Sequence, residues 1–282
     1  MSTLTVGFLG AGQIGEPMVE RLLAAGHRVR LYARRPEVRA RLSTAGALLV
    51  DAPADVAACE VVVSCLYGDT QVLAVLPEVV RAMDARTVLV SHTTGRPVTL
   101  DRLDAHGAAG GAAIVDAPFS GTADAVRAGR LVVYLGGERE HVATAREVVG
   151  AYADQMIATG VRGSALRVKL LNNLLFASIS QLTLRGLEAG RALGVEESAL
   201  LEALAVSSGG SAAGRYITAR GGAESFAVTV TPYLRKDLDA CGDVATEAGV
   251  DLSALLAAAR GGPLRLGAPS TSRTERSFED QR

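Results

Sequence analysis

The chain has 282 residues, of which 49% are hydrophobic, and its 29 basic and 30 acidic side chains give a formal net charge of −1. This length exceeds what one ordinary domain needs, and the apolar content suffices for two cores. The balanced charge creates no field that would collect nucleic acid or an anionic membrane surface, so we expect small molecules as partners.

The cysteines and the N-terminus favour a reducing location. Cys59, Cys65 and Cys241 follow no metal-ligand spacing, and an odd number of cysteines cannot close a disulfide framework. No basic segment followed by a signal core opens the chain, and no apolar run reaches the roughly 18 residues that a membrane span needs. We therefore expect a cytoplasmic protein with no membrane partner.

Short apolar runs alternate with amphipathic stretches from residue 4 to about residue 156. The stretches, such as 17–25 and 70–83, place apolar residues at helical spacing. This alternation predicts a doubly wound parallel sheet over residues 1–161. The predicted strands, each of a length typical of strands buried on both faces, are 4–9, 28–32, 61–66, 87–90, 113–115 and 131–135.

The character of the chain changes after Thr159. Residues 165–193 contain no proline and only two glycines, Gly186 and Gly190, and Gly194 then suits a helix C-terminus. Such a helix would extend about 43 Å, which is long for a single domain, so we expect it to join two domains. Further helical patterns at 196–206, 214–219, 232–248 and 252–260 predict an all-helical domain over residues 162–282, with a flexible tail from about residue 267.

The loop after the first strand carries a dinucleotide-binding pattern. Residues 10–15 read GAGQIG, with a strand before them and a helix-compatible stretch after them. Gly10 allows the tight turn, Gly12 lets the backbone approach a pyrophosphate, and Gly15 lets the helix pack closely on the strand. The phosphates would lie on free N–H groups at the helix N-terminus. A Rossmann domain is therefore predicted, and a merely structural glycine loop is the less favoured alternative.

The end of the second strand bears on the choice of cofactor. An NAD site usually carries Asp or Glu at this point, whereas the chain has Arg34 and Arg35. Two guanidinium groups favour the 2′-phosphate of NADP(H), because charge-assisted bidentate pairs are strong polar contacts. NADP(H) is the predicted cofactor, and the alternative is a solvated basic turn with no role in discrimination.

A lysine and two asparagines cluster within the predicted long helix. Lys169 and Asn173 are four residues apart and share a helix face, with Asn172 nearby. Apolar residues surround them. From these residues alone, Lys169 either extends toward solvent or is held in a cleft, where desolvation lowers the pKa of a lysine toward the range useful for proton transfer.

Four segments of the chain, in order and spacing, resemble the signatures of the β-hydroxyacid dehydrogenases within the 6-phosphogluconate dehydrogenase-like superfamily. The family includes 3-hydroxyisobutyrate dehydrogenase, tartronate semialdehyde reductase and the glyoxylate or succinic semialdehyde reductases. The likeness extends to about residue 265. The segments are residues 7–18 (GFLGAGQIGEPM), 116–122 (DAPFSGT), 169–173 (KLLNN) and 236–238 (KDL).

This resemblance implies an NADP(H)-dependent oxidoreductase that transfers a hydride between nicotinamide and the carbonyl or hydroxyl carbon of a small β-hydroxyacid or semialdehyde. Lys169 matches the catalytic lysine, which gives a proton to the carbonyl oxygen or takes it from the hydroxyl in reverse. Asn173 matches the asparagine that orients the substrate, with Asn172 beside it. Because long helices of this kind commonly pack in pairs, we also expect a homodimer.

The resemblance also implies further binding residues. Ser120, Gly121 and Thr122 occupy the substrate-carboxylate motif, where backbone N–H groups and a hydroxyl can cradle an anion. Taken alone, these three residues are compatible with an ordinary turn, and Lys236 with a surface charge. Besides the three glycines and two arginines, the expected cofactor-binding residues are Gln13, Ile14, Leu66, Thr94 and Lys236.

Some positions depart from the family pattern. Thr122 replaces the last glycine of the carboxylate motif, and Phe119 replaces a smaller aliphatic residue. Ala165 and Arg167 stand where a glycine and a small residue are usual. We expect a reshaped pocket and a substrate other than 3-hydroxyisobutyrate, with Arg167 as a candidate for binding a second anionic group.

Two alternatives to the dehydrogenase remain. Imine reductases share the architecture and the NADPH preference but usually carry Asp or Tyr in place of the helix lysine, and a non-catalytic dinucleotide-binding protein has usually lost it. Lys169 therefore favours the dehydrogenase. No zinc-ligand cluster is apparent, so we expect no metal. Among the four histidines, only His92 is a candidate for lining the cleft.

Overall fold

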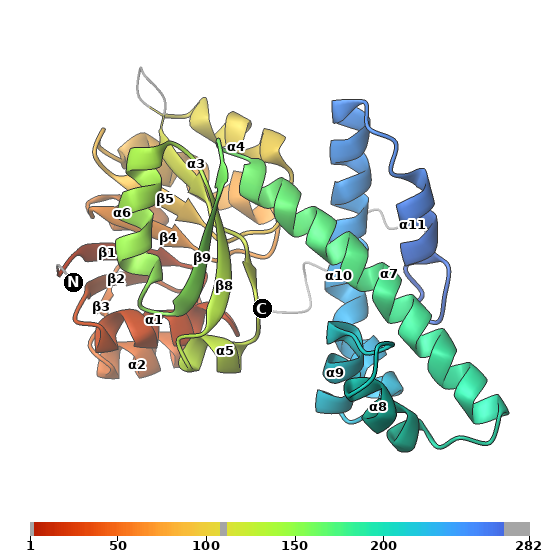
Figure 1. Ribbon diagram of the computed structural model, residues 1–282. Coiled ribbons are helices and arrows are strands. Elements are labelled where there is room, and N and C mark those ends of the chain that lie inside the picture. Colours follow the sequence, from red (N-terminus) through yellow and green to blue (C-terminus); the bar gives the residue numbers. More distant parts are fainter. Residues whose placement is uncertain (1–2, 108–111, 268–282) are drawn as a thin grey trace. The chain divides into compact units, whose positions relative to one another are not determined.

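The computed structural model describes residues 3–107 and 112–267, and Figure 1 shows its ribbon with most of its elements labelled. Contacts within the chain divide it after Leu170 into two compact units, residues 1–170 and 171–282. The first unit is α/β and the second is helical, which confirms the predicted fold class. The predicted tail beyond residue 267 lies outside the described residues.

One mixed sheet forms the centre of the first unit. Six strands run parallel in the order β3-β2-β1-β4-β5-β6, the order of the dinucleotide-binding fold. β8 is antiparallel to β6 and β7, and β9 is parallel to β8. The strands among the described residues are β1 (Thr5–Leu9), β2 (Arg28–Tyr32), β3 (Leu48–Leu49), β4 (Val61–Ser64), β5 (Val88–Ser91), β6 (Ala113–Asp116), β7 (Phe119–Ser120), β8 (Leu131–Gly136) and β9 (Ala153–Gly160).

The structure differs from the predicted parallel sheet at β8 and β9: β8 is antiparallel to β6 and β7, and β9 was not predicted. Only residues 121–130 connect β7 to β8, which is too short for the crossover that a parallel pair needs. β9 escaped prediction because most of its residues are exposed or half-buried, so it lacks the apolar run of a strand buried on both faces.

Helices cover both faces of this sheet. α1 (Gly15–Ala24) and α6 (Arg139–Val149) pack in the same apolar cluster as Val61 and Val63 of β4. The intervening residue, Val62, belongs to the cluster on the other face with α3 (Asp69–Ala82) and α4 (Pro97–Asp104). Successive side chains of β4 therefore pack into clusters on opposite faces of the sheet, as expected for a strand that is buried on both faces. The first unit also contains α2 (Pro36–Thr44), α5 (Ala123–Arg127) and a short 3₁₀ segment, Pro53–Ala57.

The predicted long helix is present as α7 (Ser164–Ala192), and the second unit continues it with four further helices among the described residues. α10 begins at residue 223, ahead of the predicted start at Pro232. Phe226, Val230 and Leu234 are all buried and four residues apart, so the apolar stripe continues through the proline. These helices are α8 (Glu197–Ala205), α9 (Ala212–Ala219), α10 (Ala223–Ala248) and α11 (Ser253–Arg260).

No helix in the described part of the chain combines the length and the apolar character of a membrane span. The three cysteines are free thiols, and Cys59 and Cys241 are buried. The cytoplasmic location stays a prediction.

His92 belongs to the core of the first unit, and its 2% exposure corrects the prediction that it lines a cleft. Its Nδ1 lies 2.6 Å from the carbonyl oxygen of Ala117, and its Nε2 lies 2.8 Å from the hydroxyl of Tyr152. Because a carbonyl can only accept, Nδ1 carries the proton, and Nε2 accepts from the Tyr152 hydroxyl. Burial lowers the pKa of His92 to about 4.

We predict that His92 makes the folded state sensitive to acid. In the unfolded chain the imidazole takes up a proton below its ordinary pKa of 6.5, whereas the folded protein resists protonation until about pH 4. The free energy of unfolding should therefore fall as the pH drops from about 6.5 to 4, by about 3 kcal/mol from this group. Urea unfolding at several pH values measures the slope.

The variant His92→Gln should flatten that slope, while the exposed control His106→Gln should not. Part of the slope should remain, because burial also lowers the pKa of His27. An unchanged slope in His92→Gln would contradict the prediction.

Candidate active site

The glycine-rich loop joins β1 to α1 and has the geometry that the sequence predicts. Gly10 has φ +90°, and a Cβ there would lie 2.2 Å from the carbonyl oxygen of Cys65. A Cβ on Gly15 would lie 2.1 Å from the carbonyl oxygen of Gly10. By contrast, a Cβ on Gly12 would meet nothing within 4 Å. Gly10 and Gly15 are thus required by packing, whereas Gly12 borders open space, as the predicted approach of a pyrophosphate to its backbone requires.

Three loops of the first unit converge at the carboxyl edge of the parallel strands. The glycine loop follows β1, the segment with Leu66 follows β4, and the segment with Thr94 follows β5. The strand order reverses between β1 and β4, and ligands of such sheets bind at this switch point. Leu66 and Thr94 are both half-buried. The fold therefore brings these two predicted cofactor residues to the same edge as the glycine loop.

Arg35 lies against the glycine loop. Its Nη2 donates a hydrogen bond to the carbonyl oxygen of Ala11 at 3.2 Å, and its side chain remains 57% exposed. Its Nε is 3.8 Å from a carboxylate oxygen of Glu37, a weak exposed ion pair. Arg34 is exposed. A largely exposed guanidinium beside the loop suits an added phosphate.

The substrate-carboxylate motif forms the end of β7 and the start of α5. Gly121 has φ +140°, and a Cβ there would lie 2.6 Å from Leu131. The Thr122 side chain accepts a hydrogen bond from the Ala125 N–H at 3.4 Å and thereby caps α5. Ser120 and Thr122 are half-buried, and Gly121 is exposed. The threonine that replaces the family's glycine therefore has a local structural role.

Asp116 is the first residue of the DAPFSGT motif, and no local sequence pattern assigns it a role. Its fully buried carboxylate accepts hydrogen bonds from the N–H groups of Gly163 at 2.7 Å and Leu166 at 3.0 Å. Burial raises the pKa of Asp116, and these hydrogen bonds act against that rise. The carboxylate satisfies N–H groups at the start of α7, the helix that carries Lys169 about one and a half turns later.

Lys169 and the two asparagines lie on α7 as predicted. Lys169 is half-buried, and Asn173, one turn further along the helix, is 9% exposed. The amide oxygen of Asn173 accepts from Asn172 Nδ2 at 3.1 Å, and its Nδ2 donates to Asp237 Oδ2 at 2.5 Å. The orientation of the Asn173 amide is therefore fixed at both ends.

Lys236 and Asp237 belong to the same cluster in the second unit. Asp237 is 4% exposed, and Lys236 Nζ lies 2.8 Å from its Oδ1, an ion pair without hydrogen-bond geometry. Asp237 thus connects Asn173 to Lys236. Asp237 lies in the KDL motif, but its contact with Asn173 could not be predicted because no spacing rule relates residues 173 and 237.

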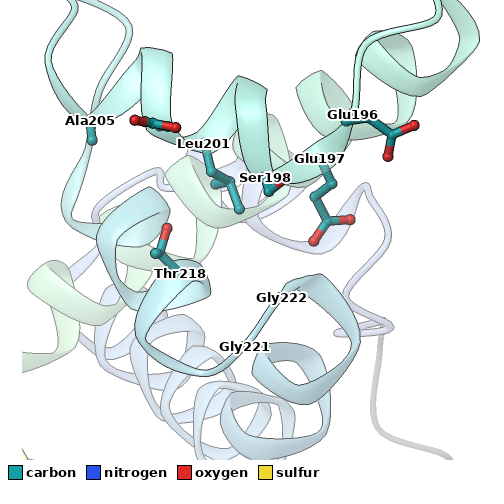
Figure 2. A pocket seen from close by; sticks show the side chains of 9 residues that line it. Glu196, Glu197, Ser198, Leu201, Ala205, Thr218, Gly221 and Gly222 are labelled. Carbon is teal, nitrogen blue, oxygen red and sulfur yellow. The ribbon is translucent and has the colours of Figure 1, made fainter.

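A surface hollow of about 740 Å³ beside α8 contains none of the predicted site residues (Figure 2). The carboxylate of Glu197 accepts a hydrogen bond from the Ala223 N–H at 3.0 Å and lies 3.2 Å from Arg191 Nη2. It therefore stabilises the N-terminus of α10. The hollow is lined by Glu196, Glu197, Ser198, Leu201, Glu202, Ala205, Thr218, Gly221 and Gly222.

No group of three or more His, Cys, Asp or Glu side chains suited to a metal ion occurs in residues 3–107 and 112–267.

Two protein families match the two parts of the chain. The NAD binding domain of 6-phosphogluconate dehydrogenase matches residues 5–160, and the NAD-binding domain of NADP-dependent 3-hydroxyisobutyrate dehydrogenase matches residues 163–261. The chain is 31% identical to 3-hydroxyisobutyrate dehydrogenase of Pseudomonas aeruginosa over 216 residues, which cover 73% of this chain and 70% of that protein. It therefore belongs to the 3-hydroxyisobutyrate dehydrogenase-like β-hydroxyacid dehydrogenases, as its four motifs predicted.

More distant relatives agree on the family and the fold. The mitochondrial 3-hydroxyisobutyrate dehydrogenase of Bos taurus is 29% identical over 221 residues, 74% of this chain, and the chain spans 63% of that protein's length. Mycobacterium tuberculosis 3-hydroxyisobutyrate dehydrogenase, solved with L-serine, has a TM-score of 0.78 at 23% identity, with 92% of each chain covered. This structural likeness supports the fold.

Proposed function

We propose that the protein is an NADPH-dependent oxidoreductase that interconverts a small β-hydroxyacid or semialdehyde pair, with Lys169 as general acid and base. The observation that carries this proposal is the combination, in one family member, of the glycine loop flanked by Arg35 with a half-buried lysine one turn from a fixed asparagine amide. The cofactor's part is to supply or accept the hydride.

The distribution of basic residues gives independent support. Of the 29 lysines and arginines in the chain, only Lys169 and Lys236 are lysines. Arginine is always protonated in proteins, whereas a lysine amine can release its proton when its surroundings favour it. The chain has arginine at its other basic positions. It has lysine at position 169, where the proposed chemistry needs a group that donates and accepts a proton.

The proposed roles follow from the chemistry of each group. Lys169 donates a proton to the carbonyl oxygen as negative charge develops there, and it removes the hydroxyl proton in the reverse direction. Asn173 orients the substrate with an amide whose rotation is fixed by Asn172 and Asp237. Ser120, Gly121 and Thr122 receive the substrate carboxylate through backbone N–H groups and hydroxyls.

The cofactor roles use the residues of the glycine loop and its neighbours. The backbone of residues 10–15, including Gln13 and Ile14, receives the pyrophosphate at the N-terminus of α1. Arg34 and Arg35 bind the 2′-phosphate and so select NADP(H) over NAD(H). Leu66, Thr94 and Lys236 complete the set of proposed cofactor contacts, with Thr94 placed near the nicotinamide ribose, as the resemblance to the family implies.

The first prediction of this proposal concerns Lys169. Replacing it with alanine should lower kcat/KM for NADPH-dependent reduction of small aldehyde acids by about a hundredfold or more, because a general acid is lost. Lys169→Arg should be similarly impaired, since a guanidinium keeps the charge but does not release its proton. NADPH oxidation measured with a panel of aldehyde acids and cyclic imines tests both variants.

Arg191→Ala is a suitable control, because Arg191 lies on the same helix in an exposed ion pair with Glu197. It should retain full activity. Turnover that persists in Lys169→Ala would reject the role of the lysine, and reduction of the imines alone would favour an imine reductase.

Cofactor choice can be tested through the arginine pair. In the double variant Arg34→Ser and Arg35→Ser, KM for NADPH should rise on the order of tenfold to a hundredfold while KM for NADH stays unchanged, because charged hydrogen bonds to the 2′-phosphate are lost. Arg28→Ser is the matched control, since Arg28 lies at the opposite end of β2. Equal changes for the two cofactors would contradict the proposed selectivity.

We further propose a homodimer that forms through α7. Leu171, Leu175, Ile179 and Leu182 are between 41% and 69% exposed and follow spacings of three and four residues along one helix face. An apolar stripe of this kind on two copies of the same helix is self-complementary, as a symmetric dimer requires.

Light scattering tests this assembly. The wild type should have the mass of two chains, and the double variant Leu175→Glu and Leu182→Glu should have the mass of one, because burying these carboxylates is costly. Val206→Glu serves as the control, since Val206 is 90% exposed elsewhere in the second unit. A monomeric wild type would reject the dimer.

A further inference from the structure

Asp69 connects two loops at the carboxyl edge of the first unit. It is the first residue of α3 and follows the segment that contains Leu66. Both oxygens of its carboxylate lie within hydrogen-bond distance of the Arg96 N–H, Oδ1 at 3.3 Å and Oδ2 at 3.2 Å. The Arg96 Nε is 3.9 Å from Oδ2. A carboxylate from the loop after β4 therefore binds the backbone of the loop after β5.

The contact between Asp69 and Arg96 leaves no space for a side chain at the neighbouring position 95. A Cβ on Gly95 would lie 1.9 Å from Asp69 Oδ1, so the carboxylate occupies the space where a side chain at position 95 would begin. The side chains of Asp69 and Arg96 are 28% and 29% exposed, so the contact is partly shielded from water. Such a charge-assisted hydrogen bond is stronger than a neutral one.

The same carboxylate acts on two helix starts. Asp69 stands in the first turn of α3, and Arg96 is the N-cap residue of α4, whose N1 residue is Pro97. An acidic group near the N-terminus of a helix is stabilised by the helix dipole. The peptide between Gly95 and Arg96 is thus fixed from one side by Asp69 and from the other by the helix that it begins.

We propose that Asp69 is a positioning residue that holds the turn from Thr93 to Arg96 in the shape that receives the nicotinamide half of the cofactor. This inference rests on the proposed function, in which Thr94 contacts that half. Asp69 itself acts through the backbone of residues 95 and 96. The adenosine half, which the glycine loop and the arginine pair receive, does not depend on it.

The experiment compares two ligands in four proteins. NADPH contains both halves of the cofactor, whereas adenosine 2′,5′-bisphosphate contains only the half with the 2′-phosphate. Fluorescence titration gives the Kd of NADPH, and calorimetry gives the Kd of the bisphosphate. In Asp69→Ala, the Kd of NADPH should rise about tenfold and the Kd of the bisphosphate should stay within about twofold of wild type.

Asp69→Asn should recover part of the NADPH affinity, because an amide oxygen still accepts from the Arg96 N–H. This conservative variant also covers the case in which the alanine variant does not fold. The matched control is Asp84→Ala. Asp84 Oδ1 accepts from the N–H groups of Arg86 at 2.7 Å and Thr87 at 3.1 Å, so it fixes the turn before β5 much as Asp69 fixes the turn after it. Asp84→Ala should leave both Kd values unchanged.

The outcomes separate the two hypotheses. If the Asp69 variants lose affinity equally for both ligands, or lose affinity for neither, the positioning role is overturned and the proposed function stays intact. A wild type that binds neither ligand would overturn both. Selective loss of NADPH affinity with partial recovery in Asp69→Asn is the result that supports the inference.

Discussion

The hydrogen bonds between the Asp116 carboxylate and the N–H groups of Gly163 and Leu166 attach the start of α7 to the end of β6. Asp116 ends β6, and the chain passes from it directly into residues 119–122, of which Phe119 and Ser120 form β7 and pair with β8. Gly136, opposite Asp116 on β8, leaves room for this arrangement, since a Cβ there would lie 2.6 Å from the carboxylate. One buried carboxylate thus fixes the start of α7 and lies just ahead of the segment proposed to bind substrate. A buried carboxylate is tolerated because backbone donors surround it.

The loops that bind ligand in this fold are held by contacts from their neighbours rather than by their own side chains. Gly10 is held against the carbonyl of Cys65, and the turn at Gly95 is held against the carboxylate of Asp69. Arg35 reaches back to the carbonyl of Ala11. These contacts arise because the parallel strands deliver successive loops to one edge, where each loop lies beside those of adjacent strands. The order of the parallel strands therefore determines which loops contact one another at the carboxyl edge of the sheet.

Much of this organisation could be predicted from the sequence, because local patterns encode it. The strand at 28–32 and the α7 helix agree closely with the structure, since apolar periodicity and a glycine stop define them. The tight packing at Gly10 and Gly15 followed from one motif in its context. The roles of Asp116, Asp237 and Asp69 did not, because each carboxylate binds a group distant along the chain, and spacing rules do not reach that far. The scarcity of lysine was a further signal, readable from the sequence alone, that would have marked Lys169 and Lys236.

Gly10 and Gly95, two of the crowded glycines, differ in the substitutions that their surroundings permit. At Gly10 the obstructing atom is a peptide carbonyl, so no substitution elsewhere makes room for a larger residue, and the positive φ adds a second restriction. At Gly95 the obstructing atom belongs to the side chain of Asp69, so a smaller residue at position 69 would release position 95. Descendants of this chain can therefore exchange the second pair together, whereas the first glycine has no compensating partner.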